Sequence, residues 1–160
     1  MKPALWAQLT PNRREALAFG AAALTLVPFA IAQAQGLAQS VALARAEIDR
    51  FTGGAEALRG KVALDLPAVA ENGASVPISI AVESPMSAAD FVERVLVVTT
   101  ANPYPRALSV SFTPASGRAE VTTRIRLAAT QEVFAVAKMS GGTFYFDSKT
   151  VAVTVGGCGG

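Results

Sequence analysis

Apolar and polar residues alternate along most of the chain after residue 60, and this period of two is typical of half-buried β-strands. In residues 118–128 the alternation is almost unbroken. Turn-forming residues separate the segments at intervals of about ten residues, a spacing common in all-β domains. The seven predicted strands lie within residues 61–67, 75–84, 91–100, 107–112, 118–128, 132–139 and 142–155.

Seven short strands of this kind predict an all-β fold, an antiparallel β-sandwich that we place at residues 56–155. Residues 91–100 are apolar almost throughout, which favours a central strand. Residues 101–105 contain Pro103 and Pro105. We expect an extended loop there, because proline interrupts the hydrogen bonding of a sheet.

Upstream of the strands, the apolar period changes to that of a helix. Residues 40–50 predict a short amphipathic helix, which the glycines of 52–54 end. The residues near its apolar face are Val41, Ala44, Ile48 and Phe51. We assign residues 35–55 to this helix and a linker, and expect the helix to pack on its own domain; a docking helix for a partner is the alternative.

Residues 1–34 have the layout of a secretory signal peptide: basic residues, an apolar run over 16–32, and small-residue cleavage sites. The sites have the Ala-x-Ala form at 30–32 and at 32–34. Arg13 and Arg14 directly precede the apolar run and indicate the twin-arginine route, with the general secretory route as the alternative. A retained membrane anchor is disfavoured, because the run is short for a span and contains Gly20 and Pro28. We therefore expect a cleaved signal, a periplasmic protein and no membrane attachment afterwards.

Signal removal changes the charge balance. The whole chain has 14 basic and 12 acidic residues. Lys2, Arg13, Arg14 and Glu15 leave with the signal, so 11 of each sign remain. A mature chain of net charge near zero without a basic cluster does not predict nucleic-acid binding.

The chain contains no histidine. Its absence excludes catalytic triads and dyads that use a histidine base, zinc sites with imidazole ligands, and the CxxCH haem motif. We therefore expect no metal site and no cofactor held by the usual ligands. The cysteine described next leads us to expect no catalytic residues, and so a protein that is not itself an enzyme.

Cys158 is the only cysteine, and it lies in the terminal sequence GGCGG (156–160). Gly156, Gly157, Gly159 and Gly160 leave it without neighbouring side chains, and glycine gives a backbone wide conformational freedom. The pattern predicts a thin, flexible swinging arm that presents one covalently bound group to several active sites. No charged side chain lies within eight residues of Cys158, so activation of the thiol is expected from partner enzymes. The alternative is an incidental terminal cysteine, although an exposed thiol is an oxidation hazard.

The mature chain resembles SoxY, the family of sulfur carriers of the bacterial thiosulfate-oxidising Sox system. The resemblance rests on the glycine-flanked terminal cysteine and on internal segments in the family's order. These segments are FTGGA (51–55), ENGASVPISIAVESPMSAADFVERV (71–95), NPYP (102–105), FTPASGRAEVTTRIRLAATQ (112–131) and VTVGGCGG (153–160).

The resemblance implies an immunoglobulin-like sandwich and a sulfur substrate attached covalently to Cys158. It implies that a SoxXA-like cytochrome joins thiosulfate to the thiol as an S-thiosulfonate, and that a SoxB-like hydrolase releases sulfate. A SoxCD-like dehydrogenase then oxidises the remaining sulfane sulfur. It also implies a heterodimer with a SoxZ-like subunit.

Two other classes of function compete with this hypothesis. A ubiquitin-like sulfur carrier also ends in Gly-Gly, but it uses an ATP-activated carboxylate, which an exported protein could not receive. A structural β-sandwich could instead form a homodimer through an intermolecular Cys158 disulfide.

Overall fold

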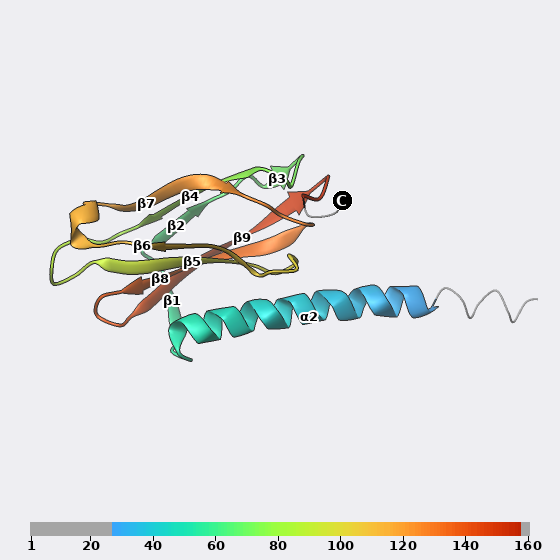
Figure 1. Cartoon of the computed structure of the whole chain (residues 1–160), viewed down its shortest axis with the longest axis horizontal. Coiled ribbons are helices and arrows are strands. Elements are labelled where there is room, and N and C mark those ends of the chain that lie inside the picture. Colours follow the sequence, from blue (N-terminus) through green and yellow to red (C-terminus); the bar gives the residue numbers. More distant parts are fainter. Residues whose placement is uncertain (1–26, 158–160) are drawn as a thin grey trace, which may run out of the picture. The chain divides into compact units, whose positions relative to one another are not determined.

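The computed structural model describes the backbone of residues 27–157 (Figure 1). Contacts divide the chain into a unit that ends at Gly36 and a unit that starts at Leu37. In the first unit, the described residues 27–36 form the first turns of helix α2 (Val27–Thr52). The second unit contains the rest of α2 and the described strands.

All seven predicted strands are present in the second unit, together with two short strands, β1 and β3, that alternation does not reveal. The strands are β1 (Ala57–Arg59), β2 (Val62–Asp65), β3 (Val69–Ala70), β4 (Val76–Val82), β5 (Val92–Thr99), β6 (Arg106–Ser111), β7 (Ala119–Ile125), β8 (Gln131–Met139) and β9 (Phe144–Val153). A 3-10 turn over Pro114–Ser116 precedes β7.

The strands form two facing sheets (Figure 1). The larger has the order β1-β9-β8-β5-β6, with β3 also paired to β9, and the smaller has the order β2-β4-β7. The long pairings are antiparallel, whereas β1 and β3 run parallel to β9. The predicted immunoglobulin-like β-sandwich is confirmed.

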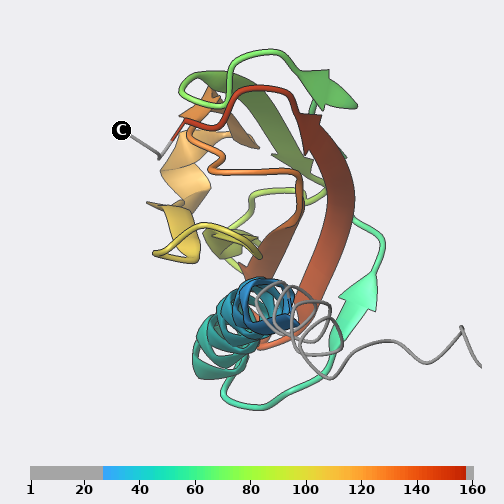
Figure 2. The same ribbon diagram turned by 90° about the vertical axis from the view of Figure 1, so that its right-hand side faces the viewer.

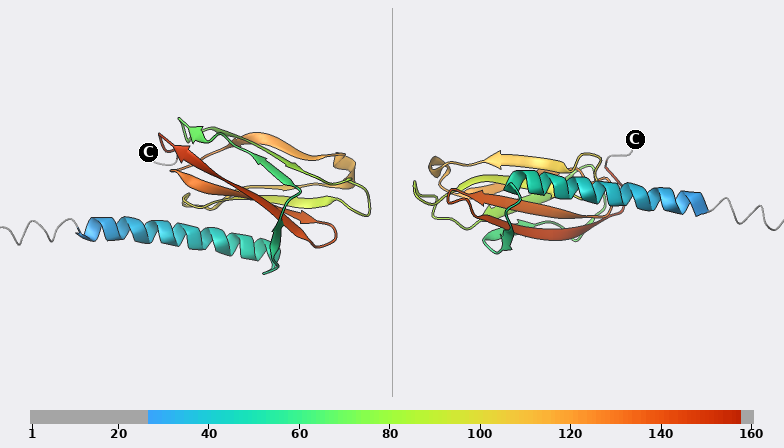
Figure 3. Two further views of the ribbon diagram at one scale, coloured as in Figure 1. Left: turned by 180° about the vertical axis from the view of Figure 1, so that it is seen from behind. Right: turned by 90° about the horizontal axis from the view of Figure 1, so that it is seen from below.

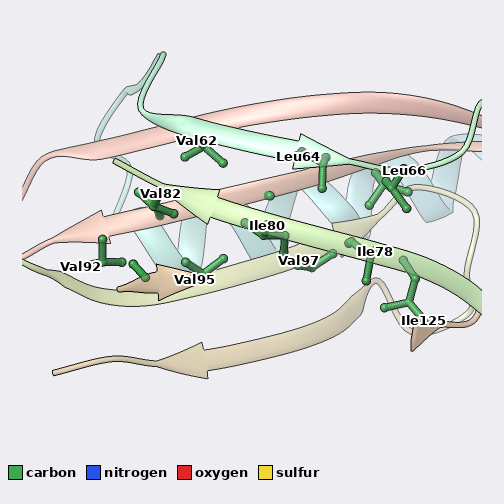
Figure 4. Packing of buried hydrophobic residues seen from close by; sticks show 14 of the residues in the cluster. Val62, Leu64, Leu66, Ile78, Ile80, Val82, Val92, Val95, Val97 and Ile125 are labelled. Carbon is green, nitrogen blue, oxygen red and sulfur yellow. The ribbon is translucent and has the colours of Figure 1, made fainter. Parts of the chain in front are cut away.

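The core lies between the two sheets, where alternate residues of facing strands meet. Figure 4 shows Val92, Val95 and Val97 of β5 close to Ile78, Ile80 and Val82 of β4. These side chains are at most 6% exposed. Each fully buried aliphatic side chain of this size stabilises the fold by about 1.5–3 kcal/mol relative to leaving it in water.

Strand β5 is buried on both of its faces, which explains why its sequence is apolar almost throughout. Its Leu96 and Val98 point away from the sandwich core and pack with Ala44 of α2. Ile48 and Phe51 of the helix join this second cluster. Seen from below in Figure 3, the part of α2 that belongs to the second unit lies on the outer face of the larger sheet. The prediction that the helix packs on its own domain is confirmed for Ala44, Ile48 and Phe51, while Val41 is 46% exposed.

The described part of helix α2 starts at Val27, upstream of the predicted 40–50 and so inside the segment assigned to the signal peptide. No proline follows Pro28 before the helix ends at Thr52, and proline is the residue that most strongly interrupts a helix. The alanine-rich sequence between these points favours continuous helix. The cleavage of residues 1–34 stays a prediction.

A charged contact also ties α2 to the sheet. Arg106 of β6 donates to Glu47 from Nε at 3.0 Å and from Nη2 at 2.8 Å, and Arg50 donates to the same carboxylate. The hydrogen bonds from Arg106 are the main cause of a lowered pKa of Glu47, and the nearby positive charges of Arg106 and Arg50 lower it further.

We expect that Val97→Ala lowers the free energy of unfolding by about 2 kcal/mol, because two buried carbons are lost and a cavity remains. Val69→Ala is the matched control, since Val69 is 58% exposed whereas Val97 is fully buried. It should change stability by less than about 0.5 kcal/mol. Urea unfolding of both variants measures the difference, and equal losses would contradict the core described above.

The Glu47–Arg106 contact predicts a pH-dependent difference in stability. At neutral pH, Arg106→Gln should lower the free energy of unfolding by about 0.5–1 kcal/mol, because Arg106 is partly exposed. A carboxyl group with a lowered pKa stabilises the fold above its unfolded pKa, near 4.5, and loses this contribution as pH falls through the folded value. The difference between variant and wild type should therefore shrink in urea titrations below pH 4.5. Arg118→Gln, which removes an exposed 3.7 Å pair with Glu120, should show little effect at any pH.

Candidate functional site

The predicted site residues divide between the described chain and its ends. Gly156 and Gly157 are described and are separated by two residues from the end of β9 at Val153. Cys158, Gly159 and Gly160 lie outside the described residues, as do Arg13 and Arg14 of the predicted export signal. The structure therefore shows the base from which the cysteine-bearing terminus leaves the sandwich.

A ring of three backbone hydrogen bonds surrounds this base. The amide of Gly73 donates to the carbonyl of Val155 at 2.7 Å, and the amide of Leu127 donates to the carbonyl of Gly73 at 2.8 Å. The amide of Gly157 then donates to the carbonyl of Leu127 at 2.9 Å, which closes the ring. We call Gly73, Leu127, Val155 and Gly157 the terminal clasp. It joins three segments that are distant in sequence, and Figure 2 shows the terminal segment beside the turn that follows β3.

The clasp brings backbone so close to backbone that side chains are excluded. A Cβ atom on Gly73 would lie 2.8 Å from the amide nitrogen of Gly157, and nearer still to the carbonyl oxygen of Leu127. A Cβ on Gly157 would lie under 3.0 Å from the backbone of Gly73, and one on Gly156 would collide in the same way with the carbonyl of Ala128. Contacts this short do not occur for real Cβ atoms. A positive φ is the other common reason for glycine, but Gly73, Gly156 and Gly157 do not have one. Glycine is needed at these positions because a side chain would not fit.

This finding differs from the sequence prediction for the arm. The sequence assigned Gly156 and Gly157 to a flexible segment because glycine permits many conformations. The structure places both in close backbone contact with the sandwich, and Gly157 in a hydrogen bond. The arm prediction for the remaining three residues falls outside the described chain.

A buried polar cluster supports the clasp from within the sandwich. Asn102, 7% exposed, donates from Nδ2 to the carbonyl of Arg126 at 2.8 Å and accepts from the amide of Ala128 at 2.9 Å. It therefore holds the chain on both sides of Leu127, whose side chain is fully buried in the core. Gln131, 4% exposed, donates to the Asn102 Oδ1 at 2.9 Å and accepts from the amide of Ala101. Buried polar groups that are fully paired in this way specify one backbone arrangement.

Two further contacts fix the segments that meet at the clasp. The carboxamide of Asn72 accepts from the amide of Ala74 at 2.8 Å and shapes the turn that contains Gly73. The amide of Thr154 donates to the carbonyl of Ala70 at 3.0 Å and extends the pairing of β3 with β9.

Sequence reasoning missed Gly73, Leu127 and Asn102. Asn102 and Gly73 lie in segments that carried the family resemblance, but nothing in their local sequence shows what they contact. Asn102 precedes Pro103, which was recognised as a loop signal alone. The position of Gly73 in a turn between two strands could have marked it as a candidate. That position does not reveal that Gly73 contacts the backbone of Leu127.

Other chemistry is not evident in the described part of the chain. Between residues 27 and 157, no group of three or more His, Cys, Asp and Glu side chains could hold a metal ion. The helix in that stretch is not long and apolar enough to cross a membrane. Two hollows lie beside α2, one lined by charged residues such as Arg94 and Lys138 and one by apolar residues such as Phe134 and Phe146. No clasp residue lines either hollow.

Comparison with known proteins identifies the group to which this sandwich belongs. The family described as "Sulfur oxidation protein SoxY" matches residues 48–158, which include the clasp and Cys158. The chain belongs to the SoxY family. No curated protein sequence matches it.

Solved structures agree with this assignment. The sulfur carrier protein SoxY from Chlorobium limicola f thiosulfatophilum superposes with a TM-score of 0.62 and 27% identity, covering 74% of this chain and 98% of that one. A superoxide reductase (neelaredoxin) from Ignicoccus hospitalis superposes with a TM-score of 0.53 and 15% identity, covering 59% of this chain and 80% of that one. The second likeness shows a shared fold alone, so the SoxY match carries the functional argument.

The polar cluster behind the clasp predicts unequal effects for two asparagines. Asn102→Ala should lower the free energy of unfolding by about 1–3 kcal/mol, because it leaves buried donors and acceptors unpaired. Asn72→Ala removes one exposed hydrogen bond and should cost less than about 1 kcal/mol. Urea unfolding compares the two variants, and a loss at Asn72 as large as that at Asn102 would refute the supporting role of the cluster.

Proposed function

We propose that this SoxY-family protein is a covalent carrier of sulfur-oxidation intermediates, with Cys158 as the attachment point. The observation that carries the proposal is that the family match runs to Cys158, the only thiol in the chain. Its position one residue after the clasp also supports this role, because a carrier needs a reactive group at the edge of the fold and not inside it.

The carrier chemistry follows from the thiol. In the loading step, Cys158 loses its proton and its sulfur bonds to the sulfane sulfur of thiosulfate, while a SoxXA-like cytochrome accepts two electrons. The product is an S-thiosulfonate. In the next step, a SoxB-like hydrolase adds water across the S–S bond to the sulfone, releasing sulfate and protons and leaving a sulfane sulfur on Cys158. A SoxCD-like dehydrogenase is the expected oxidant of that remaining sulfur.

The protein contributes attachment and presentation to these steps. The described neighbours of Cys158 are the glycines at 156 and 157, which carry no acid, base or metal ligand. A nearby cation, metal or helix N-terminus raises the thiolate fraction of a cysteine, and we assign that task to the partner enzymes. No cofactor of its own is required, since the sulfur substrate is held by the covalent bond.

The cellular setting is part of the same proposal. We infer a periplasmic protein exported through a signal peptide at residues 1–34, with Arg13 and Arg14 as the twin-arginine pair. A SoxZ-like subunit is the expected stable partner, in a heterodimer, and the Sox enzymes are expected to bind transiently. Family membership supports this set of partners.

Intact mass of the mature protein from cells grown on thiosulfate tests the carrier role. We expect a mass increment that matches one S–SO3 group or a shorter sulfur adduct, that reductant removes, and that maps to the C-terminal peptide. The matched control is Cys158→Ser, which should abolish both the increment and thiosulfate oxidation, because an alcohol cannot form the S–S bond. An unmodified thiol under all conditions, or only a disulfide-linked homodimer with oxidation intact in the serine variant, would instead favour a structural role.

A further inference from the structure

We propose that Gly73 is a positioning residue for the carrier thiol. Through the terminal clasp it fixes Gly157 to the sandwich and so sets the point at which the chain that carries the thiol leaves the fold. The functional meaning of this inference rests on the carrier role proposed above, whereas the clasp itself can be tested without any sulfur chemistry.

The first argument is the closure of the ring. Gly73 and Leu127 each use both their amide and their carbonyl within it, so each segment is tied to the other two. Leu127 cannot shift to release its neighbours, because its side chain is fully buried and Asn102 holds the chain on both sides of it. Leu127 is therefore the fixed part of the clasp, and Val155 and Gly157 of the terminal segment bind to the clasp from the other side.

The second argument is why the residues are glycine. If flexibility were the only requirement, the space around each glycine would be open. This is the case at Gly141, in the turn between β8 and β9, where an added Cβ would meet nothing within 4 Å. At Gly73, Gly156 and Gly157 an added Cβ would instead collide with backbone atoms. Close approach explains these three glycines, and a need for conformational freedom does not.

The third argument is that backbone contacts alone hold the terminal segment. Val155 is 61% exposed, so its side chain does not anchor the segment in the core. Beyond β9, the amides of Thr154 and Gly157 and the carbonyl of Val155 make the described contacts with the sandwich. A Cβ added at Gly73 would collide with the carbonyl oxygen of Leu127 and the amide nitrogen of Gly157, which are the two atoms of one clasp bond, so it is placed to break that bond.

The clasp determines how far the thiol can travel. With Gly157 fixed, one residue of chain separates Cys158 from the sandwich, a span of at most about 3.6 Å. If the clasp opened back to Val155, three residues would be free, and the span would rise to about 10 Å. The closed clasp therefore restricts the thiol to the end of the sandwich formed by the turn at Gly73 and the loop at Leu127. A partner enzyme meets the adduct together with this backbone surface.

A spin label on the single cysteine tests the proposal. A nitroxide methanethiosulfonate is attached to Cys158 in the mature wild-type protein, in Gly73→Ala and in the control Gly141→Ala. We expect Gly73→Ala to narrow the central line of the spectrum, because it releases Gly156 and Gly157 before the label, and Gly141→Ala to match the wild type. Identical spectra for wild type and Gly73→Ala would overturn the proposal.

Amide exchange provides the second measurement. The Gly157 amide should exchange several-fold to about tenfold more slowly than in an unstructured peptide, since it donates to Leu127. In Gly73→Ala this protection should disappear, while the amides in the centre of β8 stay protected. An unprotected Gly157 amide in the wild type would refute the clasp.

Gly157→Ala is a second variant that tests the clasp if Gly73→Ala does not fold. Its Cβ meets the backbone of Gly73 from the terminal side, and it lies outside the core, so the sandwich should remain intact. It should narrow the spectrum in the same way, and an unchanged spectrum would count against the proposal. Neither measurement involves thiosulfate, so a lost sulfur adduct with an intact clasp would reject the carrier role alone.

Discussion

Leu127 connects the centre of the sandwich to the end of the chain. Its side chain is fully buried between the sheets, and its amide and carbonyl bind Gly73 and Gly157. Packing in the core therefore fixes where the terminus leaves the fold. The loops that carry Asn102 and Gly73 depend on the same residue, because both bind the chain at or beside it. The buried residue Leu127 thus fixes the position of the terminal glycine Gly157.

Alternation gave a correct account of the sandwich because the two faces of each strand differ in environment. In β4 every second side chain is buried, and the period of two is visible in the sequence. Strand β5 lost the alternation because α2 covers its second face, and its continuous apolar run was still sufficient to mark a central strand. Strands β1 and β3 are three and two residues long, too short for a period to appear, and they exist because β9 offers a free edge.

The site was predictable only in part, for a different physical reason. Cys158 was recognisable as a candidate because a single thiol between glycines has no packing role. The clasp was not recognisable, because it joins backbone atoms of residues 73, 127 and 157, and hydrogen bonds between backbone groups leave no record in residue type. Glycine itself is ambiguous in sequence, since it serves both mobility and close approach. Only the positions of Ala128 and Gly73 distinguish these roles at residues 156 and 157.

Pairing on both edges of β9 also determines how the fold responds to force. The strand is bonded to β8 from Phe144 to Val151, and on its other edge to β1 and to β3. A pull on the terminus along the axis of β9 would load its ladder bonds in shear, all at once. The few bonds of the clasp are the first in line and can yield while the ladder holds.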